Sequence, residues 1–312
     1  MKVLIAVPCF NEFEDIKSTI SNLKKINKKI NADICIFDDG STDKTLLLLQ
    51  QIKDITIIFT KQNNGLSEVF NRIAHYSKEN EYEFTIIFDA DNQYPHEEIE
   101  SIIKFAKSEN SDIVLGVRNF KSNNVFSKTK NRLQILGSLV VSTVLGLRVK
   151  DATTGFRLYS SKAMENIYSS NSFSYTIETL FYANKMKFKI SEYELVNFFK
   201  TRESRLFSNN FEYIKKTLKI LLSSIFLYKP KLFWYLYFIF LLPGLYLCSR
   251  FFRNYILFGS YDGNVQSLIV GSLIVTLSTI ILVCLLVISS IKINLLNVQK
   301  NNYRPNFNII KT

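Results

Sequence analysis

An Asp-x-Asp cluster followed by an amide, Asp89–Gln93, comes directly after the apolar run Phe84–Phe88. Two carboxylates spaced two residues apart beyond a strand can reach the same point in space. Together with the amide oxygen of Gln93, Asp89 and Asp91 form a hard-oxygen donor set of the kind that binds divalent cations alongside phosphate oxygens. The cluster therefore predicts a Mg²⁺ or Mn²⁺ site. An acidic turn without a ligand is the simpler alternative.

A second acidic pair, Asp38 and Asp39, follows the apolar run Ile34–Phe37. The residues after it, Ser41–Asp43, are typical of a turn and a helix N-cap. A cap does not explain why two like charges stand together at a strand end, where they repel unless a ligand or metal separates them. The pair thus predicts a second part of the same binding site.

Short apolar runs of strand length alternate with amphipathic stretches of helical length over the first third of the chain. The predicted strands are Val3–Val7, Ile34–Phe37, Ile55–Phe59, Phe84–Phe88 and Ile113–Val117. The predicted helices are Glu12–Ile26, Asp43–Ile52, Leu66–Ser77 and His96–Lys107. This alternation predicts an α/β domain with a mostly parallel sheet. Ligands of such sheets bind at the carboxyl ends of the strands, where both acidic clusters fall.

The positive charge lies in the apolar C-terminal third. The chain of 312 residues has a net charge of +12, of which residues 1–199 carry +1 (25 Lys/Arg, 24 Asp/Glu) and residues 200–312 carry +11 (14 and 3). A hydrophobic content of 47% excludes a disordered chain, and four unpaired-looking cysteines exclude a disulfide scaffold. The basic, apolar tail favours an anionic membrane surface over nucleic acid as partner.

Two runs, residues 232–252 and 265–291, are long enough to cross a bilayer, although two buried core helices are the alternative. Before them, Thr129–Gly146 is an apolar helix of less than spanning length, and Phe211–Leu227 predicts an interfacial amphipathic helix or an ordinary surface helix. Lysines flank the outer ends of the spans. The positive-inside rule therefore predicts that both termini and the large domain are cytosolic, in a protein of the cytoplasmic membrane. The predicted divisions are 1–206, 207–231 and 232–312, the last ending in a cytosolic tail.

Six motifs occur in an order that resembles family 2 glycosyltransferases, specifically the polyprenyl-phosphate (dolichol-phosphate-mannose-synthase-like) sugar transferases. They are Val7–Glu12, Asp38–Thr42, Asn64–Leu66, Asp89–Gln93, Gly116–Arg118 and Asp151–Arg157. The resemblance covers about residues 2–206, and the C-terminal hairpin fits members with membrane anchors. It implies a GT-A (Rossmann-like) catalytic domain.

The resemblance also implies roles for individual residues. The nucleotide sugar, UDP- or GDP-linked, would be held by Pro8, Phe10, Glu12, Phe37, Asp39, Asp89, Ala90 and Asp91. The metal would be held by Asp89, Asp91 and Gln93, and the lipid phosphate by Arg118 and Arg132. Asp151 is a further catalytic candidate that lines the acceptor side or caps a turn.

The segment Lys200–Arg205 departs from the family pattern Arg-x-Gly-x-Ser-Lys, because the glycine is replaced and the basic residues are rearranged. Which of Lys200, Arg202 and Arg205 meets the phosphate is therefore left open. His75 and His96 have no ligand-spaced partner and are expected on helix surfaces. Glu178 lies on a predicted helix, Tyr175–Lys185, and faces either the site or solvent.

Taken together, these features predict a membrane-bound glycosyltransferase that transfers a sugar from a nucleotide sugar to undecaprenyl or dolichyl phosphate, with inversion. Attack by an already ionised phosphate requires cations rather than a strong base. One alternative is a processive polysaccharide synthase, but the Gln-x-x-Arg-Trp motif of that class is absent and the single Trp234 lies in the first span. Another is an inactive membrane adaptor, which would be favoured by loss of Asp89 or Asp91. Homo-oligomerisation is left open.

Overall fold

The computed structural model describes residues 2–118, 128–171, 174–196, 198, 210–259 and 264–312. The chain divides into two compact units. One comprises residues 1–222 together with 304–312, and the other comprises residues 223–303.

The first unit is built on one mixed sheet. Among the described residues its strands are β1 (Val3–Cys9), β2 (Asp33–Asp38), β3 (Thr56–Phe59), β4 (Phe84–Ile87), β5 (Ile113–Val117), β6 (Arg157–Ser160), β7 (Ile190–Glu194) and β8 (Asn308–Lys311), in the spatial order β7-β5-β6-β4-β1-β2-β3-β8. β6 is antiparallel to β4 and β5, and β8 is antiparallel to β3; the remaining neighbours are parallel. The five predicted strands and the mostly parallel sheet are confirmed.

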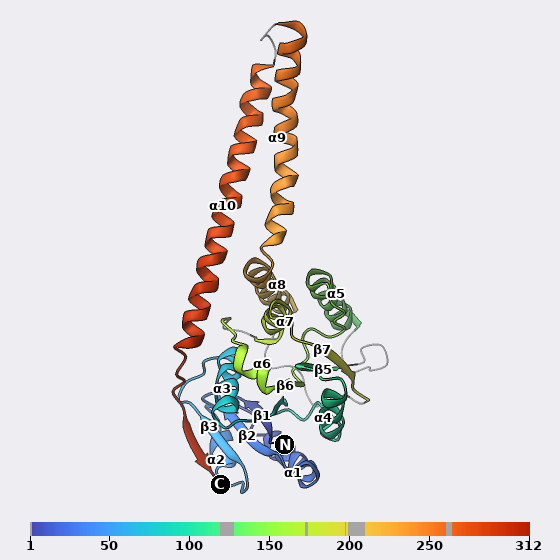
Figure 1. The fold of residues 1–312 in the computed structure, drawn as a ribbon. Coiled ribbons are helices and arrows are strands. Elements are labelled where there is room, and N and C mark those ends of the chain that lie inside the picture. Colours follow the sequence, from blue (N-terminus) through green and yellow to red (C-terminus); the bar gives the residue numbers. More distant parts are fainter. Residues whose placement is uncertain (1, 119–127, 172–173, 197, 199–209, 260–263) are drawn as a thin grey trace. The chain divides into compact units, whose positions relative to one another are not determined.

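Helices cover both faces of this sheet (Figure 1). They are α1 (Ile16–Ile30), α2 (Thr45–Leu49), α3 (Leu66–Glu79), α4 (Glu98–Ser108), α5 (Lys128–Leu145), α6 (Ser161–Asn166) and α7 (Thr176–Lys185). Alternate residues of β1, such as Val3, Ile5 and Val7, pack with α1, α2 and α4 in one core cluster. α3 and α6 lie together on the other face, where the Phe70 ring of α3 is 5.6 Å from Tyr159 of β6. Because both faces of β1 are buried, its sequence is a continuous apolar run.

The C-terminal residues differ from the predicted tail. β8 pairs with β3 in a register that sets Ile57 opposite Ile310, and the Thr312 N–H donates to the Ile55 carbonyl at 3.1 Å. The last residues of the chain are therefore an edge strand of the first unit. The predicted cytosolic tail after the second span did not include this strand.

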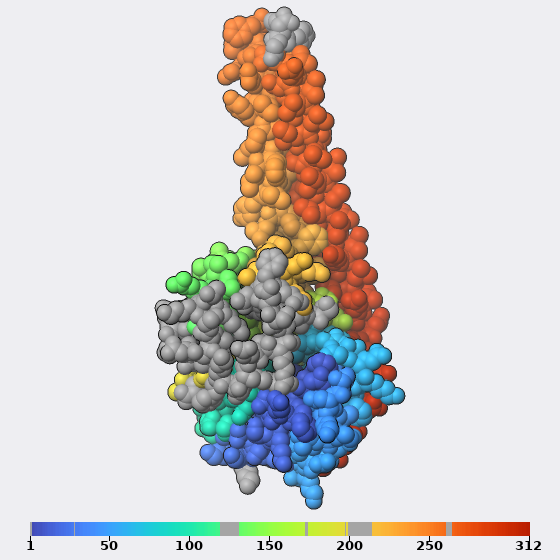
Figure 2. Space-filling model, turned by 180° about the vertical axis from the view of Figure 1, so that it is seen from behind, coloured from blue at the N-terminus to red at the C-terminus, as the bar shows by residue number. Residues whose placement is uncertain are grey.

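The second unit is a helical hairpin. α8 (Asn210–Tyr228) leads into α9 (Lys231–Phe258), and α10 (Val265–Asn301) returns along it (Figure 2). At 1.5 Å per residue, the 28 residues of α9 and the 37 residues of α10 are each long enough to cross a bilayer, and both are apolar. The two predicted spans are present as helices, and both extend beyond their predicted ends.

Glycines allow α9 and α10 to approach closely. A Cβ on Gly271 would lie 2.8 Å from both the Cys248 Sγ atom and the Gly244 carbonyl oxygen. Farther along, the Tyr237 hydroxyl lies 3.5 Å from Thr279 Oγ1. Small residues at a helix crossing are the usual packing device in membrane proteins, where lipid supplies no hydrophobic drive for association.

Candidate active site

The acidic clusters meet at the carboxyl ends of adjacent strands. β1 lies between β2 and β4 and is parallel to both. Just beyond the strands, the Asp39 N–H donates to the Cys9 carbonyl and the Phe88 N–H donates to the Ala6 carbonyl, each at 2.9 Å. The sheet thus brings the segment Pro8–Glu12, the Asp38-Asp39 pair and the Asp89–Gln93 turn to one edge.

The Asp89–Gln93 turn places two carboxylates in a confined space. Asp89 is only partly exposed, and burial together with the nearby Asp91 charge raises the pKa of Asp89 to about 7. Asn92 adopts a left-handed conformation (φ 57°), and the Gln93 N–H donates to the Asp91 carboxylate at 3.3 Å. α1 supports the turn, because the Thr19 hydroxyl donates to the Ala90 carbonyl at 2.8 Å.

These residues fit a divalent cation that a phosphate ligand helps to coordinate. Burial first, and the Asp91 charge second, disfavour the ionised form of Asp89, and a bound cation would offset both effects. Among the described residues no group of three or more His, Cys, Asp or Glu side chains is arranged to hold a metal by itself. Phosphate oxygens and water would therefore have to complete the shell, as Mg²⁺ normally requires.

The Asp38-Asp39 pair is stabilised from within the protein. Asp39 forms a buried ion pair with Arg72 of α3 and accepts the Gly65 N–H at 2.8 Å. Asp38 accepts the Ser41 N–H at 3.0 Å, and burial raises the pKa of Asp38. The inference that two adjacent acids need a ligand or metal to separate them is therefore not required, because Arg72 and these donors already offset the repulsion.

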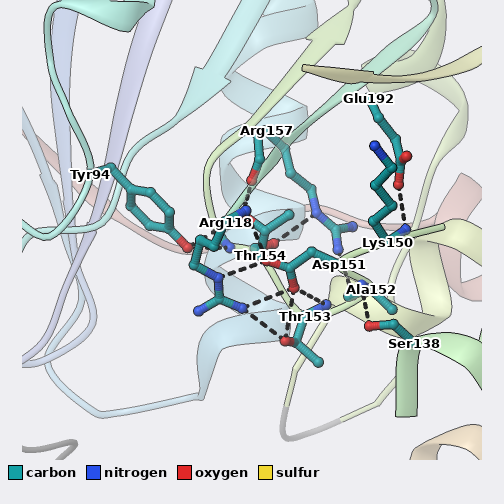
Figure 3. Close-up of polar contacts among 12 residues, drawn as sticks. Tyr94, Arg118, Ser138, Lys150, Asp151, Ala152, Thr153, Thr154, Arg157 and Glu192 are labelled. Carbon is teal, nitrogen blue, oxygen red and sulfur yellow. Dashed lines mark hydrogen bonds and ion pairs between the residues drawn. The ribbon is translucent and has the colours of Figure 1, made fainter. Parts of the chain in front are cut away.

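The loop between α5 and β6, whose polar contacts are drawn in Figure 3, approaches the Asp89 carboxylate at Gly155. Arg118, just after β5, contacts Asp151 through two bonds, from Nε to Oδ2 at 2.7 Å and from Nη2 to Oδ1 at 2.9 Å. Only 10% of the Arg118 side chain and none of Asp151 is exposed. Arg118 Nη2 also donates to the Thr153 hydroxyl at 3.0 Å. The predicted basic residue is thus held rigidly, with its charge shared with a carboxylate.

Arg157, on β6, holds the same loop through hydrogen bonds. Its fully buried guanidinium donates to the carbonyls of Ala152 (2.8 Å) and Thr154 (2.9 Å) in the loop. It also donates to the Thr176 carbonyl at the start of α7, at 2.8 Å. The loop is consequently clamped between β5 and β6.

Other predicted residues are placed differently. The Phe37 ring is fully buried and packs edge-on against Tyr76, so its side chain does not face the strand-end site. Arg132 is exposed on α5, and Phe10 is 40% exposed near the strand ends. Lys200, Arg202 and Arg205 lie outside the described residues.

Glu178 was predicted to face either the site or solvent, but it is buried against the segment that precedes α7. It is 2% exposed and accepts hydrogen bonds from Ser169, Ser170 and Asn171. His96 lies 3.2 Å from Glu97, and burial lowers the pKa of His75.

Sequence reasoning missed Arg72, Tyr94, Gly155 and Arg157 as parts of the site. The last two lie within the quoted motif Asp151–Arg157, and Tyr94 follows Gln93 directly. An arginine on the apolar face of α3, between the buried Phe70 and Ile73, was the available signal that a buried carboxylate needed a partner.

Comparison with known proteins identifies the family. The model of "Glycosyl transferase family 2" matches residues 4–168, just over half of the chain. The chain belongs to this family. It is a glycosyltransferase, and its mostly parallel sheet with flanking helices is GT-A-like.

Relatives of this family 2 member include two mannosyltransferases. A dolichol-phosphate mannosyltransferase from Pyrococcus furiosus is 27% identical over 174 residues, which cover 54% of this chain and 48% of that protein. An undecaprenyl-phosphate mannosyltransferase from Micrococcus luteus is 24% identical over 173 residues (54% and 70%). The chain therefore spans about half the length of the Pyrococcus enzyme.

Solved structures agree with the fold. A glucosyl-3-phosphoglycerate synthase from Mycobacterium tuberculosis, in complex with Mn²⁺, UDP and phosphoglyceric acid, has a TM-score of 0.54 at 16% identity, covering 72% of this chain and 78% of that one. A mannosyltransferase from Pyrobaculum calidifontis, in complex with GDP-Man and Mn²⁺, has a TM-score of 0.52 at 14% identity (72% and 62%). At these identities the likeness shows the fold alone.

Proposed function

We propose that this family 2 glycosyltransferase transfers a sugar from a nucleotide sugar to a polyprenyl phosphate. The observation that supports this acceptor is the presence of two apolar, bilayer-length helices, α9 and α10, in one chain with a GT-A-like domain. An enzyme anchored in this way acts at the membrane surface, where a polyprenyl phosphate exposes its headgroup. The names of the Pyrococcus and Micrococcus relatives support the same acceptor class.

The donor half of the site is the edge formed by β1, β2 and β4. Asp39, which holds the backbone of Asn64 and Gly65, would shape the wall against the nucleoside. Asp89 and Asp91, with Gln93, would hold Mg²⁺ or Mn²⁺ against the diphosphate. Such a cation, when bound, offsets the negative charge that grows on the departing diphosphate.

The acceptor half uses charge rather than a strong base. A phosphate monoester has its second pKa near 6, so its oxygen is largely ionised at neutral pH. That oxygen attacks the anomeric carbon while the bond from this carbon to the diphosphate breaks, and the nucleoside diphosphate leaves with both bonding electrons. A single displacement inverts the anomeric configuration. We assign the approach of the lipid phosphate to the exposed Arg132 and to Arg118, whose side chain is 10% exposed, with Lys200, Arg202 and Arg205 as further candidates.

The test is direct. Membranes containing the full chain are incubated with a panel of labelled UDP- and GDP-sugars and polyprenyl phosphate, with Asp91→Asn as the inactive control. We expect one donor to place label in an organic-soluble lipid, with loss of the label in the control. Label found only in a water-soluble polymer would instead identify a polysaccharide synthase and refute the acceptor.

We further propose that the first unit and both termini face the cytosol, in the cytoplasmic membrane. Five lysines precede or open α9 and four basic residues follow the apolar part of α10 (Lys215, Lys216, Lys219, Lys229 and Lys231; Lys292, Lys300, Arg304 and Lys311). Cysteine labelling of intact cells should reach a probe placed at Ser260 and miss one at Ser108. The opposite pattern would reverse the orientation.

A further inference from the structure

A directional chain of hydrogen bonds joins the turn after β4 to the loop before β6. The Gly155 N–H donates to the Tyr94 hydroxyl at 2.9 Å, and this hydroxyl lies 3.4 Å from Thr154 Oγ1. The Thr154 hydroxyl donates its only proton to the Gly116 carbonyl at 2.7 Å. Because that proton is committed, Tyr94 must donate to Thr154 while accepting from Gly155. Each hydroxyl is thus used both as donor and as acceptor.

Gly155 lies directly against the Asp89 carboxylate. A Cβ built on Gly155 would be 2.5 Å from Asp89 Oδ2 and 2.8 Å from Oδ1. The backbone of the loop therefore forms the surface on which this carboxylate rests. Any displacement of Gly155 changes the space available to Asp89, and glycine is the residue that lets the loop come this close.

The Tyr94 ring is fixed by aromatic neighbours, and the residue is only 3% exposed. Its centroid lies 5.5 Å from the Phe156 ring, 5.4 Å from Phe198 and 6.3 Å from Phe88. These contacts use the ring faces and edges, so they do not depend on the hydroxyl. Replacing Tyr94 by Phe removes the hydrogen bonds and leaves the packing that sets the ring position.

We propose that Tyr94 is a positioning residue of the transfer site: its hydroxyl holds the Gly155 amide and thereby sets the position of the Asp89 carboxylate for the cation–diphosphate group. The proposal rests on the proposed function, in which Asp89 and Asp91 hold that group. Arg157 holds the neighbouring carbonyls of Ala152 and Thr154, and the Tyr175 hydroxyl donates to the Gly155 carbonyl at 3.4 Å. Tyr94 is the side chain that accepts the Gly155 N–H.

The matched control is Tyr82, which is equally buried at 3% and whose hydroxyl donates to Asp33 at 2.7 Å. Tyr82 and Asp33 lie at the starts of β4 and β2, which is the edge of the sheet opposite the site. Tyr82→Phe therefore removes a buried tyrosine hydroxyl without touching the Asp151–Gly155 loop. An effect seen in Tyr94→Phe but not in Tyr82→Phe therefore comes from the place of Tyr94 beside the loop, and not from the loss of a buried hydroxyl in general.

The first measurement needs no ligand. Amide hydrogen exchange, followed by mass spectrometry on the full chain in detergent, reports the peptide that contains Gly155. Tyr94→Phe should accelerate exchange in that peptide relative to wild type and to Tyr82→Phe, because the Gly155 N–H loses its acceptor. Unchanged exchange overturns the proposal, whatever the reaction turns out to be.

The second measurement titrates Mn²⁺ in the presence of UDP and, separately, GDP, and detects free Mn²⁺ by electron paramagnetic resonance. Loss of one hydrogen bond that positions a ligand weakens binding by roughly tenfold, so Tyr94→Phe should raise the half-saturating Mn²⁺ concentration by about that factor. Tyr82→Phe should leave it unchanged. Equal Mn²⁺ binding by wild type and Tyr94→Phe overturns the proposal. If exchange is accelerated in Tyr94→Phe but the wild-type protein binds no Mn²⁺, the proposed function is refuted instead.

Gly155→Ala provides an independent perturbation of the same contact. Its φ angle is not in the left-handed region, so the backbone conformation suits alanine, and the three atoms nearest to the added methyl group all belong to the Asp89 carboxylate. We expect a larger loss of Mn²⁺ affinity than in Tyr94→Phe, with a thermal midpoint close to that of wild type. Wild-type Mn²⁺ affinity in Gly155→Ala would show that Asp89 does not depend on the loop.

Discussion

Replacing Arg118 by Met tests whether the Arg118–Asp151 pair stabilises the loop beside the candidate active site. The substitution removes the bonds from Nε to Oδ2 and from Nη2 to Oδ1, and it leaves Asp151, which has no exposed surface, without its cation. Removing one partner of a buried ion pair costs about 3–5 kcal/mol. For a unit of this size, 1 kcal/mol shifts the thermal midpoint by about 2–4 °C, so we expect a fall of roughly 6–20 °C.

The assay is thermal unfolding in detergent of a double-mutant cycle made of Arg118→Met, Asp151→Asn and the double variant. Because the double variant has no unpaired buried charge, it should be less destabilised than the sum of the single variants, by about 1–3 kcal/mol. Lys162→Met, which breaks the exposed pair with Asp112, is the control and should cost less than about 1 kcal/mol. Additive effects of Arg118→Met and Asp151→Asn would refute the pairing argument.

Three further predictions concern the metal site, the hairpin and the C-terminus. Burial and Asp91 raise the pKa of Asp89 to about 7, so the folded, metal-free protein binds more protons than the unfolded chain, and its thermal midpoint should fall as the pH rises from about 5 to about 8. Mn²⁺ should cancel that fall and Asp89→Asn should remove it; a flat profile in the metal-free wild type would contradict the assignment. Gly271→Leu should destabilise the hairpin by about 1–3 kcal/mol, because a side chain there meets α9, whereas Gly137→Leu, with open space around it, should have little effect on unfolding measured in detergent. Deleting residues 304–312 should lower the midpoint and promote aggregation, measured by light scattering, since it exposes the edge of β3; an unaltered, monodisperse protein would show that β8 contributes little.

The elements that could be predicted from the sequence are those with a strong apolar pattern. β1 to β5 are continuous apolar runs because the sheet is covered on both faces, and α9 and α10 are unbroken apolar helices. β6, β7 and β8 were missed because they are four or five residues long and carry polar side chains, as in Ile190–Glu194. An edge strand such as β8 is defined by its partner, which lies some 250 residues earlier, and not by its own pattern.

The acidic side of the site could be predicted because it depends on short spacings. Asp89 and Asp91 are two residues apart at a strand end, so any parallel sheet brings them together. The residues that support the carboxylates could not be predicted, because their contacts join segments that are distant in the sequence. These contacts pair Asp39 with Arg72, Tyr94 with Gly155, and Arg118 with Asp151. The pairing of these buried polar groups depends on the strand order and on the register of the sheet. Both are set by the antiparallel insertion of β6 between β4 and β5.

The pairing of β8 with β3 also constrains how the hairpin can cross a membrane. The chain leaves the first unit after residue 222, passes through α9 and α10, and returns to the same sheet at Asn308. A single crossing would place β8 and β3 on opposite sides of the bilayer, where they could not share hydrogen bonds. If α9 spans, α10 must therefore span in the opposite direction. The facing of Gly244 with Gly271 and of Tyr237 with Thr279 shows the antiparallel packing that this requires. Strand pairing in the first unit thus supports an even number of crossings. The flanking lysines predict the same number independently, from their charge.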